Sequence, residues 1–343
     1  MLEQDAAGLG RAYAGAAARR TPAALGVNPA ALPDAASVSA SLHGLDNQLK
    51  PHDAASDALI PALYAAGNGF GAGLSVPFGL ATDYPAGWRG QARALHSEIT
   101  AARATIAGSA AIAPGLRLGA GVFVQRLDAQ LSEAITLAPR ITHAVQVNGS
   151  ATDPGFSLGA LWQPSPILAV GLGYGSPVWH DLKGRATLPG AQPRSRVRLT
   201  TPETVAAGLV LRVRPALDLL AGATWTRWSR LASLDIRLAN GATLRERHDW
   251  RDTWRLSLGG EYRTGPWTLR TGLAWDQSPV PDAARRTPRL PDSDRRWGAL
   301  GVGYRWRDWQ LDLGHAHLWF DAARTEQPPV APITWSPTCS RSA

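Results

Sequence analysis

The stretch Pro215-Ala216-Leu217-Asp218-Leu219-Leu220-Ala221-Gly222-Ala223-Thr224-Trp225-Thr226 alternates apolar and polar residues directly after a short turn. One side of the predicted strand is apolar and finishes at a tryptophan; it consists of Leu217, Leu219, Ala221, Ala223 and Trp225. The opposite side holds Asp218 and mostly small residues. Side chains alternate between the two faces of a strand, so the apolar side fits lipid and ends at an interfacial aromatic residue.

Six short turns, including this one, recur about every 50 residues, and one long polar or Pro/Gly-rich segment separates each from the next. The turns are Gly67-Asn68, Ala113-Pro114-Gly115, Gln163-Pro164-Ser165-Pro166, Arg214-Pro215-Ala216, Thr264-Gly265-Pro266 and Arg307-Asp308. Short turns at one end and long loops at the other are typical of a transmembrane β-barrel. Only a closed barrel lets strands sit in lipid without unpaired backbone groups. We therefore predict an all-β fold, a transmembrane antiparallel β-barrel.

The composition agrees with this fold. The 343 residues are 45% hydrophobic, yet they contain no run of 18 apolar residues, which excludes a transmembrane helix. The 14 tryptophans outnumber the 5 phenylalanines and 6 tyrosines combined, and tryptophan favours membrane–water interfaces. Cys339 is the only cysteine, so neither an intrachain disulfide nor a cysteine-based metal site can form.

The net charge of +8 comes almost wholly from arginine, because Lys50 and Lys183 are the only lysines. A basic chain can bind nucleic acid. Here the arginines are scattered singly through predicted strands and loops, so we expect no nucleic-acid partner. Charge inside the barrel and contact with anionic lipid head groups account for the excess.

Thirteen strands are predicted, at 36–44, 58–66, 69–78, 97–112, 115–133, 154–163, 167–180, 197–213, 216–238, 243–263, 266–277, 293–306 and 309–320. A soluble β-sandwich would also alternate, but its strands are usually far shorter than the stretches 216–238 and 243–263. Bacterial single-chain barrels have even strand numbers, so we expect one strand to be missing from this count.

The first 35 residues fit no strand and predict small helices and turns, because they combine glycines with runs of alanine. A segment that is neither strand nor tail is expected inside the barrel as a plug. No signal peptide is visible at Met1–Asp5, although a barrel of this kind must be exported. We expect either that a leader was removed or that the start codon was assigned too late.

Several separated motifs resemble the FadL/TodX family of outer-membrane transporters for long-chain fatty acids and other hydrophobic compounds. The residues 8–15 and Asn28-Pro29-Ala30 resemble the N-terminal hatch of that family. The stretch 76–82 resembles its third strand, where a kink opens the barrel wall. Further matches lie at 224–229, 276–282 and 291–295, so the resemblance covers about residues 3–322.

This resemblance implies a fourteen-stranded barrel in the bacterial outer membrane, with residues 1–35 as hatch and 36–322 as barrel. The chain is expected to be a monomer that takes up hydrophobic small molecules among outer-membrane lipid and lipopolysaccharide. Ligand is captured by extracellular loops, moves to a pocket beside the hatch and leaves sideways at the kink.

The resemblance also implies candidate site residues. The hatch side of the path is assigned to Gly8, Gly10, Asn28, Pro29 and Ala30. The lateral gap is assigned to Pro77, Phe78, Gly79 and Leu80, and we expect strand-forming substitutions of Pro77 and Gly79 to close it. The capture loops are assigned, by position only, to 130–150 and 178–196, with an apolar stripe of Leu131, Ile135, Leu137, Ile141 and Val145. That stripe could equally form a short helix that caps the barrel.

Other functions fit the sequence less well. His248-Asp249 and the pair His315 and His317 lack a nucleophile motif or a third metal ligand, so we expect no enzyme, no metal and no cofactor. The alternative is a general diffusion porin or a structural or adhesive outer-membrane barrel, against which the hatch argues. Residues 323–343 depart from the family and are rich in proline, so we expect an unstructured or frameshifted tail without a membrane strand.

Overall fold

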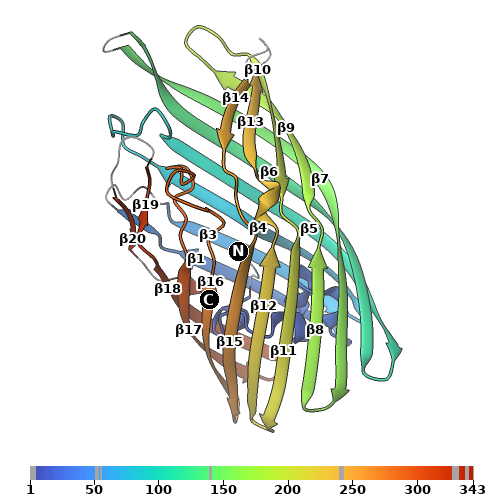
Figure 1. Cartoon of the computed structure of the whole chain (residues 1–343). Coiled ribbons are helices and arrows are strands. Elements are labelled where there is room, and N and C mark those ends of the chain that lie inside the picture. Colours follow the sequence, from blue (N-terminus) through green and yellow to red (C-terminus); the bar gives the residue numbers. More distant parts are fainter. Residues whose placement is uncertain are drawn as a thin grey trace.

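The structure, a computed structural model, describes residues 5–50, 54, 56–138, 141–238, 243–326, 332–336 and 340–342. Long antiparallel strands form a tilted barrel, and short N-terminal helices lie inside its lower half (Figure 1). Among the described residues, no helix is both long and apolar enough to cross a membrane.

The wall consists of strands that run without interruption and of strands that are broken in two. The uninterrupted strands are β1 (Ser37–Leu45), β3 (Ala58–Gly67), β4 (Phe70–Asp83), β5 (His96–Ala113), β6 (Leu116–Ala138), β7 (Ile141–Ser165), β16 (Trp267–Asp276), β17 (Arg295–Trp306) and β18 (Trp309–Phe320). The broken strands are β8–β9 (Leu168–Gly175 and Val178–Thr187), β10–β11 (Arg194–Thr201 and Thr204–Arg214), β12–β13 (Leu217–Thr226 and Ser233–Leu238) and β14–β15 (Thr243–Arg247 and Thr253–Thr264). Nine uninterrupted and four broken strands give the thirteen crossings that the sequence predicts.

Strand pairing is antiparallel and follows the chain around the wall. The ladder runs from β1 to β3 and onward through β8, β11, β12 and β15 to β18. All six predicted turns are confirmed as two-residue connections between neighbouring strands. At these turns Asn68, Gly69, Gly115, Gly265 and Arg307 adopt positive φ, which tight hairpins require.

Two predicted strands were too long. The stretch 216–238 is interrupted by a 3-10 helix, η4 (Trp228–Arg230). The strand ends there because the backbone N–H of Arg227 donates to the carbonyl oxygen of Glu203, and the guanidinium of Arg227 donates to the carboxylate of Glu203. The stretch 243–263 is interrupted around Asp249, whose φ is +46°. The length argument against a sandwich rests instead on β5, β6 and β7, which have 18, 23 and 25 residues.

The tail 323–343 was expected to be unstructured and to contain no membrane strand, but ten of its described residues lie in three short strands, and the last of these pairs with the barrel wall. Pro332–Ser336 (β20) joins a small sheet with β19 (Ala323–Arg324) and β2 (Gln48–Lys50). Ser340–Ser342 (β21) pairs with both β18 and β1, so three residues lead the ladder from the last long strand back to the first. The prolines of the tail all precede these three residues, which is why a short ladder can form there.

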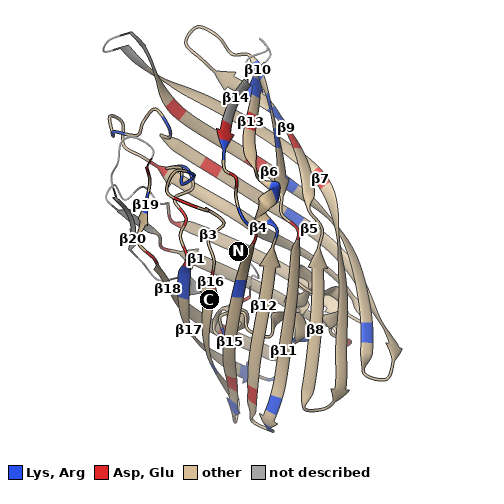
Figure 2. Ribbon diagram, viewed as in Figure 1, with Lys and Arg blue, Asp and Glu red and all other residues tan. Residues whose placement is uncertain are grey.

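The outer face is apolar over a band bounded by aromatic residues. On β15 the outward side chains of Trp254 and Tyr262 are 49% and 48% exposed and delimit about 26 Å of strand. Tilting of the strand reduces this to about 20 Å, close to the apolar height of outer-membrane barrels. Figure 2 shows charged residues mainly above and below an uncharged middle section of β8, β11 and β12.

The hatch contains α1 (Ala6–Leu9) and three 3-10 helices, η1 (Ala16–Ala18), η2 (Pro22–Gly26) and η3 (Pro29–Ala31). It approaches so many strands because their lumen-facing positions carry glycine at its level. A Cβ added to Gly10 would lie 2.7 Å from the Cα of Gly301 on β17, and one added to Gly259 would lie 3.0 Å from the carbonyl oxygen of Arg11. The wall positions of this kind, here called the glycine belt, are Gly71, Gly73, Gly119, Gly159, Gly171, Gly173, Gly208, Gly222, Gly259, Gly272, Gly301 and Gly314.

Candidate functional site

Strand β4 contains a bulge that interrupts its ladder with β5. Ser75 pairs with Arg103, but the next assigned pair is Phe78 with Ala101. Val76 and Pro77 therefore both stand opposite Ala102, which makes one extra residue on β4. Pro77 suits this place because it has no backbone N–H to give to a ladder.

The bulge decides which way the following side chains point. Below it Leu74 faces lipid and is 57% exposed. Above it Phe78 and Leu80 stand opposite the buried residues Ala101 and Ile99, so they face the lumen although they share the even numbering of Leu74. One extra residue exchanges the two faces of a strand.

The ladder between β3 and β4 ends at the same level. Its last assigned pair is Leu63 with Leu74. Above that pair the described residues 58–62 of β3 pair with β1, and the described residues 78–83 of β4 pair with β5. The wall between β3 and β4 is thus held by backbone pairing only below the bulge.

Behind the bulge lies an apolar cluster, here called the lumen cluster. Its buried members come from opposite sides of the barrel and are Ile99, Ala101, Leu127, Leu131, Leu182, Val197 and Leu234. Phe78 and Leu80 pack against it from β4, as do Leu199 and Ile236 from the far side. The upper lumen therefore offers an apolar environment that begins at the bulge.

Three aromatic rings connect the lumen cluster to the extracellular loops. Phe78 lies 6.1 Å from the ring of Trp228 on η4, which lies 5.3 Å from the ring of Trp250. Trp250 is buried with Leu231 and with Val280 from the loop 277–294. We call Phe78, Trp228 and Trp250 the aromatic line.

The loop 277–294 folds down over the barrel mouth and is held there by buried polar contacts. Arg289 is 7% exposed and forms ion pairs with Glu133 at 2.6 Å and with Glu246 at 3.4 Å. Tyr84 donates a hydrogen bond of 2.9 Å to the carbonyl oxygen of Pro288, and burial raises the pKa of its phenol. This loop covers the outer end of the aromatic line.

A polar chain borders the lumen cluster on the side of the bulge. Arg103 donates to the Oε1 atom of Gln125 at 2.7 Å and lies over the ring of Phe123 at 3.9 Å. The amide of Gln125 contacts His180 at 3.0 Å, and His180 contacts Asp153 at 2.8 Å. Arg103 itself forms no ion pair with any acid in the described part of the chain.

The floor of the lumen is closed by ion pairs between the hatch and the wall. Arg19 of the hatch bonds both Asp218 on β12, at 2.8 Å, and Glu261 on β15. The two carboxylates are 0% and 2% exposed, and Arg263 also contacts both. Arg270 reaches Glu261 at 3.1 Å.

The predicted hatch residues are structural anchors in this arrangement. Asn28 is fully buried, and its amide donates to the carbonyl oxygens of Ala17 at 2.6 Å and of Ala160 on β7 at 2.9 Å. Pro29 and Ala30 lie against Gly119 and Gly159. The predicted positions Gly8 and Gly10 lie at α1, where the Gly8 amide donates to Asp5 and Gly10 contacts Gly301. A direct contact of these residues with substrate stays a prediction.

The predicted apolar stripe of the capture loop is neither a loop nor a helix. Leu131, Ile135, Leu137, Ile141 and Val145 all lie on β6 and β7, and the segment 178–196 is occupied largely by β9 and β10. Of those whose side chains the structure describes, Leu131, Ile135 and Val145, only Leu131 belongs to the buried members of the lumen cluster. The prediction failed because a strand of alternating residues and an amphipathic helix of similar composition are hard to tell apart over a short window.

The lumen cluster and the aromatic line were missed from the sequence. A signal was present, because the apolar positions of a single strand change phase. On β6 the outward residues Val122 and Val124 are exposed, whereas further along Leu127 and Leu131 are buried inward. When the apolar side chains of a strand face outward at one level and inward at the next, the lumen is apolar only above the membrane band.

The match to known proteins decides the family. The model of the outer membrane protein transport protein family (OMPP1/FadL/TodX) matches residues 1–333. The chain belongs to this family. It is accordingly an outer-membrane protein, as the resemblance predicted, and the family consists of transport proteins rather than enzymes.

Curated relatives align over part of their length. The chain is 26% identical over 299 residues to a long-chain fatty acid transport protein of Salmonella typhi, covering 76% of the chain and 68% of that protein. It is 29% identical over 201 residues to the putative outer membrane protein NMB0088 of Neisseria meningitidis, covering 50% of the chain and 43% of that protein. It is also 29% identical over 208 residues to the long-chain fatty acid transport protein of Escherichia coli K12, covering 55% of the chain and 46% of that protein. The chain thus spans about half the length of several of these relatives.

Solved structures show the same fold. A FadL homologue of Pseudomonas aeruginosa superposes with a TM-score of 0.87 at 24% identity, covering 99% of this chain and 96% of that chain. The toluene transporter TodX of Pseudomonas putida gives a TM-score of 0.80 at 20% identity, covering 100% and 99%. The predicted plugged barrel is confirmed by these likenesses.

Proposed function

We propose that this protein takes up hydrophobic compounds and releases them sideways through the wall beside the β4 bulge. Substrate enters under the loop 277–294, follows the aromatic line and reaches the lumen cluster. The observation that carries the proposal is the position of Phe78. It packs against the lumen cluster and directly follows the bulge in β4. It also lies just above the last pair of the β3–β4 ladder.

Energy favours a lateral exit over an axial one. Each buried methylene of a ligand gains about 0.8 kcal/mol relative to water. An exit through the floor would lead an apolar ligand past the ion pairs of Asp218 and Glu261 into water. An exit beside β4 leads it onto the lipid face, where the apolar side chains of Leu74 and Leu63 directly below the bulge are 57% and 47% exposed.

Arg103 favours a substrate with an acidic head group, such as a fatty acid, over a neutral hydrocarbon. Its guanidinium lies on the lumen face directly below the bulge, beside Ala101 of the lumen cluster, and no described acid pairs with it. A carboxylate at this place would gain a charge-assisted hydrogen bond while its chain fills the lumen cluster. The curated relatives that are named long-chain fatty acid transport proteins support a substrate with an acidic head group.

Deletion of Pro77 is the sharpest test of the lateral route. Val76 alone would then stand opposite Ala102, so the bulge disappears while Phe78 keeps its partner Ala101 and its place in the lumen. The substitutions expected to close the gap, at Pro77 and Gly79, cannot do so because they leave the extra residue in place, and Gly79 already pairs with Thr100.

We expect the deletion to lower uptake of a labelled fatty acid about tenfold in cells that lack other uptake routes, with binding in detergent unchanged. Pro77→Ala, which retains the extra residue, is the matched control and should transport nearly as the wild type does. Wild-type uptake by a folded deletion variant would refute the lateral route. Passage of sugars in a liposome-swelling assay would favour the diffusion porin instead.

A further inference from the structure

The outward face of the barrel carries a group of cations above the apolar band. On β9, β10 and β13 the inward residues Leu182, Val197 and Leu234 are buried, and the alternate positions point out of the barrel. Six exposed outward residues form what we call the cationic patch: Lys183, Arg185, Arg194, Arg196, Arg198 and Arg237. Figure 2 shows blue segments on β9 and β10 in the upper part of the molecule.

Strand register brings these cations directly opposite one another. Arg194 pairs with Arg185, and Arg196 stands between Lys183 and Arg237. Like charges in directly opposite positions destabilise a sheet. The same outward face holds two acids, Asp181 and Asp235, so six cations and two acids leave a net charge of +4. The one ion pair of the patch with Asp181 is that of Arg196, at 3.4 Å.

The patch lies at the height of lipid head groups. Trp179 is 63% exposed and marks the upper edge of the apolar band on β9. Its partner is Thr200, and the next outward pair above it is Asp181 with Arg198, where the patch begins. Anionic head groups attract basic side chains in this layer. Neither nucleic acid nor a soluble acidic protein needs a cationic surface at that depth.

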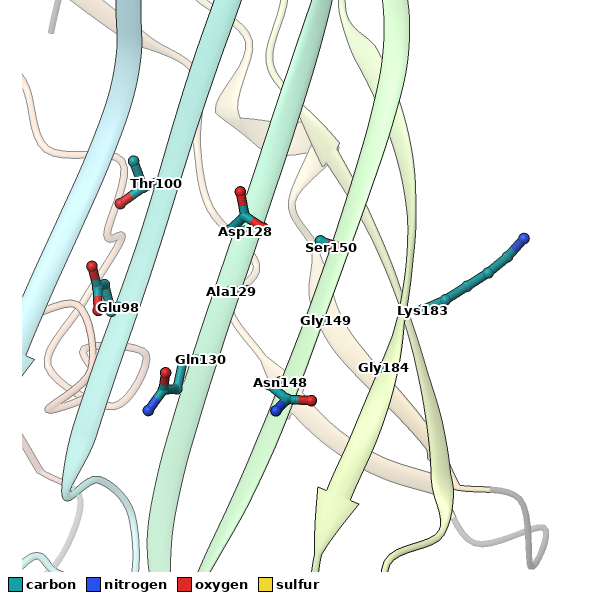
Figure 3. A pocket seen from close by; sticks show the side chains of 10 residues that line it. All are labelled: Glu98, Thr100, Asp128, Ala129, Gln130, Asn148, Gly149, Ser150, Lys183 and Gly184. Carbon is teal, nitrogen blue, oxygen red and sulfur yellow. The ribbon is translucent and has the colours of Figure 1, made fainter.

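The surface there is hollowed rather than flat. Arg196, Arg198 and Arg237, together with Ser233 and Asp235, line a depression of about 100 Å³. Beside it a wider polar concavity of about 350 Å³ extends over β5, β6, β7 and β9, and Lys183 stands at its edge and points away from the sheet (Figure 3). Its lining contains hydroxyl, amide and carboxylate groups, from Thr100, Ser150, Gln130, Asn148, Glu98 and Asp128. Such groups can bond sugar hydroxyls next to a phosphate.

We propose that the cationic patch binds the phosphorylated sugar head group of an outer-leaflet glycolipid, the chemistry of lipopolysaccharide. The guanidinium groups of Arg196, Arg198 and Arg237 receive the phosphate oxygens in the small depression, since the planar fork of arginine matches phosphate geometry. The sugar lies over the wider concavity, and the acyl chains run down the apolar band. The site is independent of the transport route, because every residue of it faces outward.

Binding of purified deep-rough lipopolysaccharide to the detergent-folded protein tests the proposal. The triple variant Arg196→Gln, Arg198→Gln, Arg237→Gln should bind about tenfold more weakly. The control Arg247→Gln, Arg251→Gln, Arg296→Gln removes the same number of exposed charges, each paired with an aspartate away from the patch, and should bind within about twofold of the wild type. Heat-modifiable gel mobility verifies folding, and Lys183→Gln with Arg185→Gln serves as a second patch variant.

The form of the lipid separates the possible sources of affinity. Glycolipid without its phosphates should bind the wild-type protein as weakly as intact glycolipid binds the patch variant. Inorganic pyrophosphate should fail to displace the intact glycolipid, because it lacks the acyl chains. Equal binding by wild type and both patch variants, or by intact and dephosphorylated glycolipid, would overturn the proposal. Full displacement by pyrophosphate would also overturn it and indicate a site for soluble anions.

Discussion

Asp218 and Glu261 stand directly opposite each other on β12 and β15, and the guanidinium of Arg19 bonds both carboxylates from the hatch. Two buried acids in opposite positions would repel each other. The hatch therefore supplies a charge that the wall needs, and the wall fixes the hatch in return. Arg263 shares this role from the wall itself, so the hatch and β15 act together on the same pair.

Replacement of Arg19 by Gln should loosen the hatch without unfolding the barrel. Loss of the charged hydrogen bonds of Arg19 should cost about 2 kcal/mol, because Arg263 and Arg270 still pair with the two carboxylates. In the detergent-folded protein we expect chymotrypsin to cleave near Tyr13 at least about tenfold faster than in the wild type. Arg126→Gln, which removes an exposed arginine on the outer face, is the control and should leave this rate unchanged. Full protection of the hatch in the Arg19 variant would show that the glycine belt alone holds it.

The glycine belt predicts a contrast between two alanine substitutions. A Cβ at Gly159 would overlap the side-chain oxygen of Asn28, whereas a Cβ at Gly260 would meet Thr271 only at 3.8 Å. Gly159→Ala should therefore displace Asn28 and cost about 2 kcal/mol through its lost hydrogen bonds, while Gly260→Ala should be neutral or slightly stabilising. Amide hydrogen exchange at residues 28–32 measures the effect. Equal protection in the two variants would contradict the close fit.

Arg103 predicts a difference between substrate classes. Arg103→Gln should weaken binding of a long-chain fatty acid about tenfold and leave binding of a neutral hydrocarbon of the same length within about twofold, because only the acid can use the charge. Arg103→Lys should restore part of the lost affinity. The readout is equilibrium binding in detergent, measured with both ligands on each variant. Equal losses for the acid and the hydrocarbon would assign Arg103 a structural role through Gln125 and Phe123 instead.

The loop region around His248 should weaken in acid. Burial lowers the pKa of His248, which is 3% exposed and whose ring lies 5.2 Å from that of Trp250, although the charges of Glu246 and Asp249 oppose the shift. In the folded protein His248 binds a proton less readily than in the unfolded chain. The local free energy of unfolding is therefore highest above a pH of about 6.5 and decreases as the pH falls below that value. Hydrogen exchange at residues 248–252, corrected for intrinsic rates, should rise between pH 7 and pH 5. His248→Phe should remove this dependence, and a flat profile in the wild type would exclude it.

The sequence predicted what local alternation and turn chemistry determine. The turn predicted at Gly67-Asn68 is found one residue later, at Asn68-Gly69, and the lipid face of Leu219 is found as expected. The contacts that it could not predict are distant in the chain: Arg19 meets partners 199 and 242 residues away. The bulge at Pro77 depends on a single residue of register, which becomes visible only when the partner strand is known.

The capture loop shows a different limit. Residues 130–150 were assigned to a capture loop by their position alone, but the strands β6 and β7 continue well above the membrane band and pair across these positions. Beyond Val124 the outward-facing residues of β6 are polar, so the alternation of apolar and polar residues no longer shows where the strand ends. The same change of phase is what builds the lumen cluster.

Each glycine of the belt leaves space that particular hatch residues occupy, so mutations in the hatch and in the wall cannot accumulate independently. A larger residue at Gly119 is compatible only with a hatch that withdraws Pro29 and Ala30 from it, and a larger residue at Gly272 only with one that withdraws Arg11. Among related barrels, these positions should therefore co-vary in size across more than a hundred residues of sequence. A hatch grafted from a distant relative would fail in this wall even if every ion pair were preserved.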